Sequence, residues 1–298
     1  MNQINEYLLL AVSVVMMLAY SVARNKFSKT CVKTMTDYHA FNLLSSALST
    51  AVLIGLSGGI RIPSLFTLLT GIIFGLITVF SSIVILQALT IGPISYTTVM
   101  ITSSMIIPAL SGRLFWNEPI YPGQYIGMVL IIISVVFSIN KSDNSKSSSV
   151  KWLMLSLAAF LLCGLTGIMQ KLHQSSSYRS ELNEFLIIAF SVSTIVSLGM
   201  YLWYSQKKKI PKSGSYKVTS PIFRMGVISG VFIALSNQIN LYLSGAMDSA
   251  IFFPVVNGGG LVLTAIVAIA FLKEKLSRRQ WLGLSIGILA ILLLCNVI

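Results

Sequence analysis

Long apolar segments leave this chain few ways to fold. Hydrophobic residues make up 55% of its 298 residues and charged residues only 10%, whereas a soluble domain carries about 25% charged residues. A globule of this size cannot bury so much apolar surface, so lipid has to cover the rest. A membrane-spanning helix needs about 20 mostly apolar residues. Ten segments meet this requirement, at residues 7–24, 37–57, 65–88, 94–115, 122–139, 152–171, 184–204, 222–244, 249–272 and 279–297.

The ten expected spans form two related sets of five. The pair Gly71 and Gly75 is answered 155 residues later by Gly226 and Gly230. A second set is answered 156 residues later: Glu118, Gln124 and Gly127 by Glu274, Gln280 and Gly283. Glycines four residues apart let helix backbones approach closely. Their recurrence at equivalent places favours a packing role that both halves share.

The repeat predicts the architecture. Because five spans is an odd number, the second set enters the membrane in the opposite direction to the first. Inverted repeats are a recurring plan of secondary transporters, with substrate bound near the midplane where the repeats meet. We therefore expect an all-α integral membrane protein in which two inverted five-helix repeats, 1–140 and 151–298, surround a central cavity. The polar segment 141–150 is expected to link them.

The basic residues predict an orientation. Of the 21 Lys and Arg residues, 17 fall in loops on one side of the expected spans and 4 on the other. The positive-inside rule places the richer side in the cytoplasm, so both termini are expected outside. The net charge of +13 is then a topology signal, and no nucleic-acid partner is expected. The expected location is the cell membrane, as a multi-pass protein of a bacterial plasma membrane in contact with its lipids.

Enzymatic chemistry has little support in the sequence. There is no phosphate-binding loop and no metalloprotease or serine-hydrolase motif, and the three cysteines lack metal-ligand spacing. We expect no catalysis, cofactor or metal. All eight acidic residues lie at or near the ends of spans, which argues against a mid-membrane carboxylate that binds protons and cationic drugs in turn. The best proton-sensitive candidates are Asp37 and His39.

Neutral polar residues gather at mid-depth in the fourth and ninth spans. Thr102, Ser103 and Ser104 lie at the centre of the former. The latter carries Asn257 followed by three glycines, 258–260, which weaken a helix and open its backbone to approach. Both a solute site and tight helix packing explain this pattern. Asn237, Gln238 and Asn240 in the eighth span either face a wet cavity or bond neighbouring helices.

The doubled motif is similar to that of the drug/metabolite transporter superfamily, in particular its EamA-type ten-span members. The resemblance covers nearly the whole chain. Its strongest matches are Phe115, Glu118, Gln124 and Gly127, then Phe271, Glu274, Gln280 and Gly283. The resemblance implies a ten-helix basket and transport of small metabolites, often by efflux. A Trp-Gly pair common in the first span of relatives is Ala19 and Tyr20 here, and many relatives keep both termini in the cytoplasm, unlike the charge pattern of this chain.

The function expected from the sequence is export of a small organic solute by alternating access. The expected cavity residues supply amides, hydroxyls and aromatic rings: Tyr20, Gln87, Tyr96, Thr102, Ser103, Asn237, Asn240, Tyr242, Asn257 and Gly258. Glu118 and Glu274 are expected to brace helix ends. The alternative is a lipid or lipid-carrier translocase, with Lys26, Lys171 and Arg113 at its mouth. The sequence is compatible with a monomer and with a homodimer.

Overall fold

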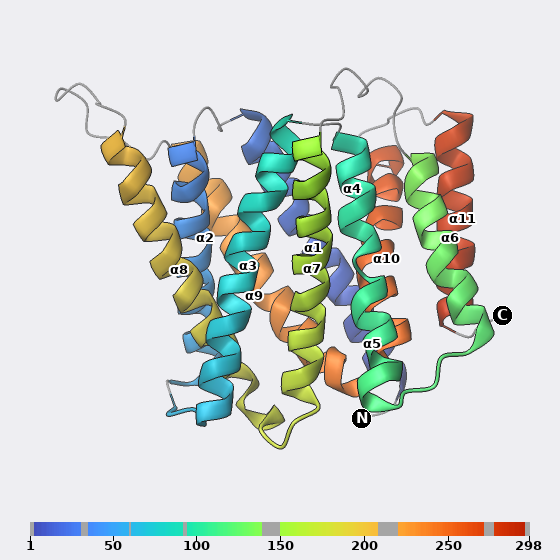
Figure 1. Cartoon of the computed structure of the whole chain (residues 1–298), viewed down its shortest axis with the longest axis horizontal. Helices are drawn as coiled ribbons and strands as arrows, with labels where there is room; N and C mark the ends of the chain where they lie inside the picture. Colours follow the sequence, from blue (N-terminus) through green and yellow to red (C-terminus); the bar gives the residue numbers. More distant parts are fainter. Residues whose placement is uncertain are drawn as a thin grey trace. The chain divides into compact units, whose positions relative to one another are not determined.

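The described parts of the chain are helical, as expected. A computed structural model describes residues 3–30, 35–59, 61–91, 94–138, 150–207, 220–270 and 277–295. The helices, in the order shown in Figure 1, are α1 (Gln3–Thr30), α2 (Met35–Ser57), α3 (Leu65–Ile91), α4 (Ile94–Ser103), α5 (Ile106–Trp116), α6 (Pro122–Ser138), α7 (Val150–Gln174), the short 3₁₀ helix η2 (Arg179–Glu181), α8 (Leu182–Lys207), α9 (Ser220–Ala246), α10 (Ser249–Ala270) and α11 (Arg278–Leu294).

The membrane-spanning character is clear in much of this set. Six helical segments of the described chain are long and apolar enough to cross a membrane. Two further apolar helical segments, Ile4–Tyr20 and Pro122–Phe137, are shorter. The all-α membrane class is therefore confirmed, while the count of ten spans stays a prediction.

The fourth expected span is broken into α4 and α5. Ser104 and Met105 lie between the two helices, and their N–H groups donate to carbonyls three residues earlier, over 3.2 and 3.3 Å. Pro108 explains the break, because proline has no N–H and its ring clashes with the carbonyl four residues before it. That carbonyl belongs to Ser104, and it accepts from Ile107 at 3.1 Å instead. Pro254, by contrast, lies inside the continuous helix α10.

Residue contacts divide the chain into two compact units. The first unit comprises 1–14, 80–175 and 241–298, and the second comprises 15–79 and 176–240. Both units take segments from both halves of the sequence. The division into repeats at 1–140 and 151–298 is a different description, based on sequence, and it remains a prediction.

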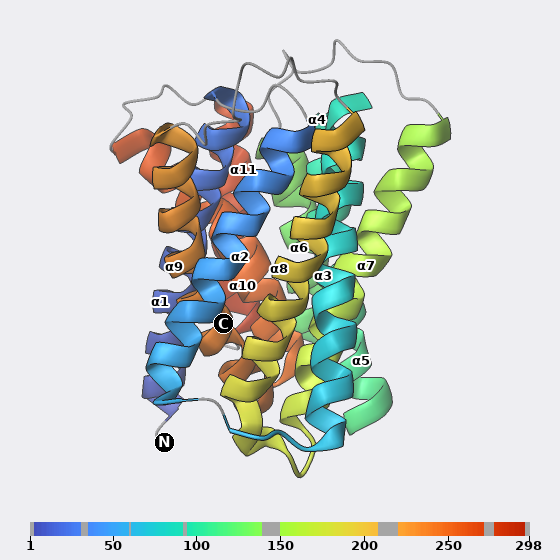
Figure 2. The ribbon, with the colours of Figure 1, turned by 90° about the vertical axis from the view of Figure 1, so that its left-hand side faces the viewer.

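In the second unit, glycines bring helices together in two matching places. Helix α2 lies beside α8 (Figure 2). A Cβ atom added to Gly75 of α3 would lie 2.6 Å from the carbonyl oxygen of Ala189 in α8. A Cβ atom added to Gly230 of α9 would lie 2.7 Å from the carbonyl oxygen of Ser45 in α2. The close-packing role expected for these glycines is confirmed.

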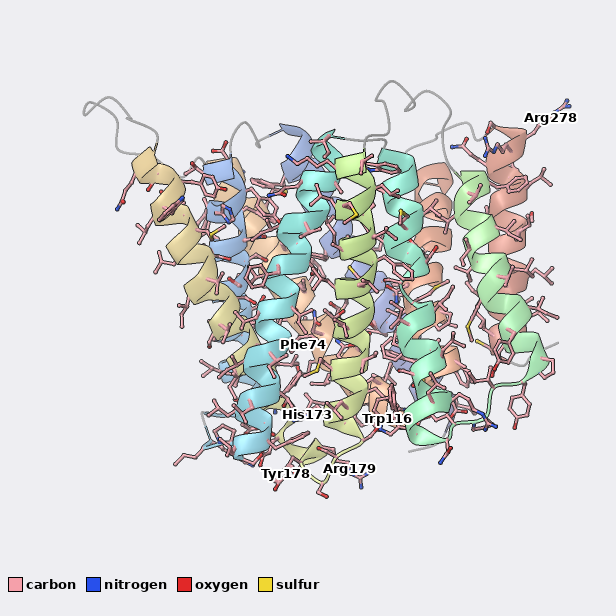
Figure 3. The ribbon with its side chains drawn as sticks, in the orientation of Figure 1. Phe74, Trp116, His173, Tyr178, Arg179 and Arg278 are labelled. Carbon is pink, nitrogen blue, oxygen red and sulfur yellow. The ribbon has the colours of Figure 1, made fainter. Side chains whose placement is uncertain are left out.

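The same contacts carry a matching pair of hydrogen bonds. The hydroxyl of Ser49 in α2 donates to the carbonyl of Gly230 at 2.8 Å. The hydroxyl of Ser193 in α8 donates to the carbonyl of Gly75 at 3.5 Å. The ring of Phe74, labelled in Figure 3, lies 5.1 Å from that of Phe185. The contact of α3 with α8 therefore resembles the contact of α9 with α2. The glycine belongs to the first half of the chain in one contact and to the second half in the other.

In the first unit, α6 packs beside α11 (Figure 1), and the doubled motif has a structural explanation. The Oε1 atom of Gln124 accepts from the N–H of Tyr121 at 3.0 Å, and that of Gln280 accepts from Ser277 at 2.9 Å. Each glutamine thus caps the start of its helix. At Gly127 an added Cβ would lie 3.0 Å from the carbonyl oxygen of Ala290. Glu274 lies outside the described residues.

Candidate functional site

Ser103 of α4 and Asn257 of α10 use their donors within their own helices. The hydroxyl of Ser103 donates to the carbonyl of Val99 at 2.8 Å. The Nδ2 group of Asn257 donates to the carbonyl of Phe253 at 2.9 Å. Each bond fixes the direction of its side chain. A backbone carbonyl only accepts, so the donor in Asn257 must be the amide nitrogen and not the amide oxygen. The oxygen atoms of Ser103 and Asn257 are left to accept hydrogen bonds.

Asn257 is the exposed residue in a buried stretch of α10. Its neighbours Val255, Val256 and Gly258 are buried, and the Asn257 side chain is exposed. An amide facing hydrocarbon has no partner there, which costs several kcal/mol per unsatisfied group. Asn257 therefore suits a polar, wet space. An added Cβ on Gly258 would lie 2.9 Å from Cγ2 of Ile131 in α6, so Gly258 contributes to helix packing.

The other expected cavity residues fall into both units. Tyr20 is half-buried in the second unit, where Nδ2 of Asn240 lies 3.4 Å from Sδ of Met17, one turn before Tyr20 on α1. In that unit Asn237 donates to the carbonyl of Ile233 at 2.9 Å. The half-buried members in the first unit are Gln87, Thr102, Ser103 and Tyr242. The Tyr96 side chain lies outside the described residues. That all ten line one cavity remains a prediction.

Some polar side chains of the eighth expected span bond neighbouring helices. Nε2 of Gln238 donates to Oδ1 of Asn183 in α8 at 2.9 Å. The proton-sensitive candidates from the sequence, Asp37 and His39, are buried at the start of α2. The His39 ring stacks on that of Tyr204 in α8, with centroids 5.3 Å apart. Gln238 and His39 thus pack one helix against another.

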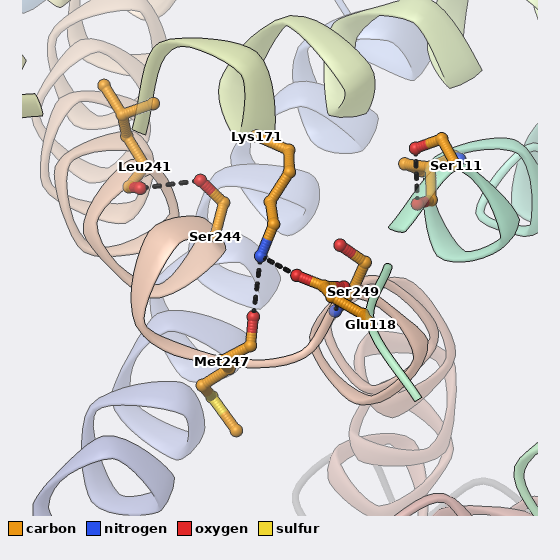
Figure 4. A network of polar contacts seen from close by, with 8 residues as sticks. Ser111, Glu118, Lys171, Leu241, Ser244, Met247 and Ser249 are labelled. Atoms are coloured by element: carbon orange, nitrogen blue, oxygen red, sulfur yellow. Dashed lines mark hydrogen bonds and ion pairs between the residues drawn. The ribbon is translucent and has the colours of Figure 1, made fainter. Parts of the chain in front are cut away.

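A buried ion pair that the sequence reasoning missed ties helix ends together (Figure 4). Lys171, near the end of α7, pairs with Oε1 of Glu118, which follows α5. Nζ of Lys171 also donates to the carbonyl of Met247 at 3.1 Å. Oε2 of Glu118 accepts from the N–H of Ser249, the first residue of α10, at 2.8 Å. Glu118 thus braces a helix end, the role expected for it.

The chain shapes this cluster through two short turns. Asn117 adopts a left-handed conformation (φ 53°) that ends α5, and the N–H of Glu118 donates to the carbonyl of Gly112 at 3.1 Å. A Cβ on Gly112 would overlap Oε2 of Glu118 and lie 2.7 Å from Cβ of Ser249. The carbonyl of Asp248 accepts the first N–H bonds of α10. Asp and Ser before an apolar run are a signal for the start of a helix. The sequence therefore indicates this turn, but it does not indicate which residues contact the turn.

Asp248 lies half-buried in the turn before α10, next to the ion pair. Burial raises the pKa of its carboxyl group above the usual value, and the nearby Glu118 carboxylate raises it further, against the opposing effect of Lys171. The folded protein therefore holds this proton more tightly than the unfolded chain. A raised carboxyl pKa makes stability fall as pH rises from the unfolded pKa near 4 through the folded pKa.

We expect the substitution Asp248→Asn to remove this part of the pH dependence. Thermal unfolding of the purified protein, followed by tryptophan fluorescence from pH 4 to pH 8, should show a smaller loss of stability with rising pH than in the parent. Glu184→Gln, in the second unit, is the matched carboxyl-to-amide control and should leave the profile unchanged. An identical profile for Asp248→Asn and the parent would contradict the prediction.

Apolar helices of spanning length, one interrupted by a polar turn and another carrying an exposed amide in a buried stretch, define a multi-pass helical membrane protein. Residues 150–296 match the model of the EamA-like transporter family. This match over the second half of the chain supports membership of the drug/metabolite transporter superfamily, the family that the doubled motif resembles.

Two further comparisons place the chain among known proteins. It is 24% identical over 191 residues to an uncharacterized protein of Haemophilus influenzae, a match that covers 63% of this chain and 62% of the relative's length. It also resembles a protein of known crystal structure, with a TM-score of 0.72 and 12% identity, over 97% of this chain and 99% of the other. At this identity the likeness concerns the fold.

Proposed function

We propose that the protein is a secondary transporter that exports a small organic solute by alternating access. Its solute site would include the acceptor oxygens of Ser103, beside the α4–α5 break, and of Asn257 in α10. The exposed amide of Asn257 in a buried stretch carries this proposal. Broken helices at mid-depth are where transporters bind substrate, and the α4–α5 turn supplies such a break.

The proposed architecture is ten spans in two inverted repeats of the cell membrane, with both termini outside. The matched glycine contacts of α3 with α8 and of α9 with α2 support the repeat. Without a nucleotide-binding motif, uphill transport would draw on an ion gradient or an exchange substrate. Buried Lys171 is engaged by Glu118 and Met247, which leaves it little suited to a lipid headgroup and favours a soluble solute over the lipid-translocase alternative.

We expect Asn257→Ala to reduce export strongly while membrane abundance stays at the parent level. The alanine removes an acceptor for the solute but keeps the helix, since the Phe253 carbonyl loses only a side-chain bond. The measurement is untargeted metabolite profiling of medium and cytosol from cells that express either variant. A metabolite enriched in the medium with the parent alone would identify the cargo.

Ser205→Ala is the matched control. The Ser205 hydroxyl also donates to a carbonyl of its own helix, that of Leu202, at an exposed position. This variant should export like the parent. Loss of protein in step with loss of export in Asn257→Ala would assign Asn257 to packing instead. Equal export by parent and variant would remove it from the site.

A further inference from the structure

Helix α8 of the second unit carries a groove along its C-terminal half. The groove has a volume of about 360 Å³ and is lined by Val196, Gly199, Met200, Trp203 and Tyr204; we call it the α8 groove. These residues recur every three to four positions, so they share one face of the helix. Pockets that bind small molecules have volumes of about 300–1,000 Å³. The α8 groove is therefore large enough to hold a ligand.

Gly199 creates open space in this groove. Apart from its own helix backbone, no heavy atom of the described residues lies within 4 Å of a Cβ atom added at Gly199. At Gly75, which packs one helix on another, the same atom would lie 2.6 Å from the carbonyl oxygen of Ala189. Gly199 therefore does not serve close packing within the second unit, although glycine is less favourable than alanine inside a helix. The space that it leaves suits a ligand from outside the chain.

The α8 groove lies near the end of an apolar helix of membrane-spanning length. That helical segment, Arg179–Gln206, ends three residues after Trp203, and the Trp203 side chain is exposed. Tryptophan is enriched where a span leaves the hydrocarbon. The exposed side chains on the adjoining surface of α8 are the apolar Ile195, Leu198 and Leu202. The groove therefore faces lipid, with acyl chains beside the helix and headgroups beyond Trp203.

The helix ends at the headgroup level carry strong positive charge. His39, near the start of α2, stacks on Tyr204, near the end of α8, with ring centroids 5.3 Å apart. The start of α2 and the end of α8 therefore lie at the same end of the second unit (Figure 2). The stretches around the connections that leave this end, residues 24–33 and 207–224, contain four and six Lys and Arg residues and no acidic residue.

Positive charge also continues the face of α8 that carries the groove. Lys207, the last residue of α8, follows Trp203 by four positions and so falls on the same face of the helix. The acidic residues of the second unit do not balance this charge. Glu181 and Glu184 lie at the other end of α8, and Asp37 is buried at the start of α2. Lysine and arginine near a membrane surface attract anionic lipids.

We propose that the α8 groove binds an anionic phospholipid, with one acyl chain beside Gly199 and Trp203 and the headgroup at the Lys207 end of the helix. The lipid is a ligand of the second unit and not its cargo, so the proposal does not depend on the transport function. A second copy of the chain suits the groove less well. Copies inserted in the same direction would meet about a two-fold axis, which would bring the basic ends of both α8 helices together against their mutual repulsion.

The test is quenching of Trp203 fluorescence by lipids with brominated acyl chains. Trp116→Phe, Trp152→Phe and Trp281→Phe leave Trp203 as the single tryptophan. The purified protein is reconstituted in phosphatidylcholine vesicles that contain a small fraction of brominated phosphatidylglycerol or, in a parallel series, brominated phosphatidylcholine. Bromine quenches a tryptophan that it contacts. Brominated phosphatidylglycerol should bind beside Trp203 about fivefold more tightly than brominated phosphatidylcholine, the effect of one lysine near the headgroup.

Two substitutions separate the groove from the charge beside it. Lys207→Gln removes charge and leaves the groove open, and it should remove most of the preference for phosphatidylglycerol. Gly199→Leu keeps every charge and fills the groove, and it should lower quenching by brominated phosphatidylglycerol to the level of brominated phosphatidylcholine. Because Gly199 borders open space, this variant should fold as the parent does.

Trp281 provides a matched control position. It is exposed near the start of α11, directly after Arg278 and Arg279, so it has basic neighbours on another helix. A protein with Trp281 as its single tryptophan should show a much smaller preference for phosphatidylglycerol than the Trp203 protein. An equal preference at both positions would mean that anionic lipid gathers at basic helix ends in general, which would overturn the proposal.

The remaining outcomes are equally decisive. Equal quenching of Trp203 by the two brominated lipids, or a preference that survives in Gly199→Leu, would overturn the proposal. Protection of Trp203 from both lipids, together with cross-linking through Gly199→Cys in a cysteine-free background, would assign the groove to a second copy instead. Trp152 donates to Thr97 at 2.8 Å. If its replacement prevents folding, the quenching that Trp203→Phe removes from the otherwise unchanged protein measures the same preference.

Discussion

Replacing Lys171 with methionine is expected to destabilise the protein by about 3–5 kcal/mol, the usual cost of removing one partner of a buried ion pair. The side chains of Lys171 and Glu118 are 5% and 12% exposed, so the Glu118 carboxylate would remain out of water without its counter-charge. The carbonyl of Met247 would also lose its donor. Thermal unfolding of purified protein should show a loss of roughly 10 °C, at about 2–4 °C per kcal/mol.

The double variant Lys171→Met with Glu118→Gln provides the control. Its neutral amide oxygen can still accept from the N–H of Ser249, and no uncompensated charge is left. Replacing a buried pair by neutral groups is often close to neutral, so the double variant should recover most of the lost stability. A double variant as unstable as the sum of the two single variants would show that the pair matters through its shape rather than its charge.

Alanine at Gly75 or Gly230 is expected to destabilise the second unit by about 1–3 kcal/mol, as overpacking does. In each case the new Cβ would meet a backbone carbonyl of the neighbouring helix, 2.6 Å away at Gly75 and 2.7 Å away at Gly230. Backbone cannot turn aside as a side chain can, so the helices must separate. Thermal unfolding of the two variants should give losses of similar size, because their surroundings correspond.

Gly199→Ala in α8 is the matched control for these glycines. Nothing lies within 4 Å of a Cβ added at Gly199, and alanine favours the helix by up to about 1 kcal/mol over glycine. This variant should be as stable as the parent or more stable. Equal destabilisation at all three positions would mean that glycine is needed in these helices for a reason other than close contact.

The sequence was sufficient for the all-α membrane class and for part of the packing of the helices. Apolar segments and polar gaps indicated the helices, and the recurrence of Gly71 and Gly75 as Gly226 and Gly230 predicted close packing that the structure contains, without its partners. The place of Gln124 and Gln280 in the doubled motif also has a local cause, since each caps the turn in which it lies. Features that depend on neighbours in the chain can be derived from the chain alone.

Features that depend on distant partners could not be derived in this way. Lys171 and Glu118 are 53 positions apart, and only tertiary packing decides that both are buried at the same point. Asp248 was likewise expected only to lie at or near the end of a span, and the sequence did not indicate that its surroundings include Glu118 and Lys171. The break after Ser103 was missed for another reason, because Pro108 alone does not say whether a helix bends or ends, and Pro254 in α10 shows the opposite outcome.

The second unit contains segments from both halves of the chain, and this affects the order in which it can form during synthesis. Its helix α2 packs beside α8, and the ribosome completes α2 long before α8 emerges. Gly75 of α3 likewise lacks its contact until Ala189 of α8 has been synthesised. Newly inserted α2 and α3 therefore stay in the bilayer for an interval without their packing partners. They complete their packing only when the second half of the chain has been inserted. That interval is the stage at which insertion factors and membrane proteases would recognise the nascent protein.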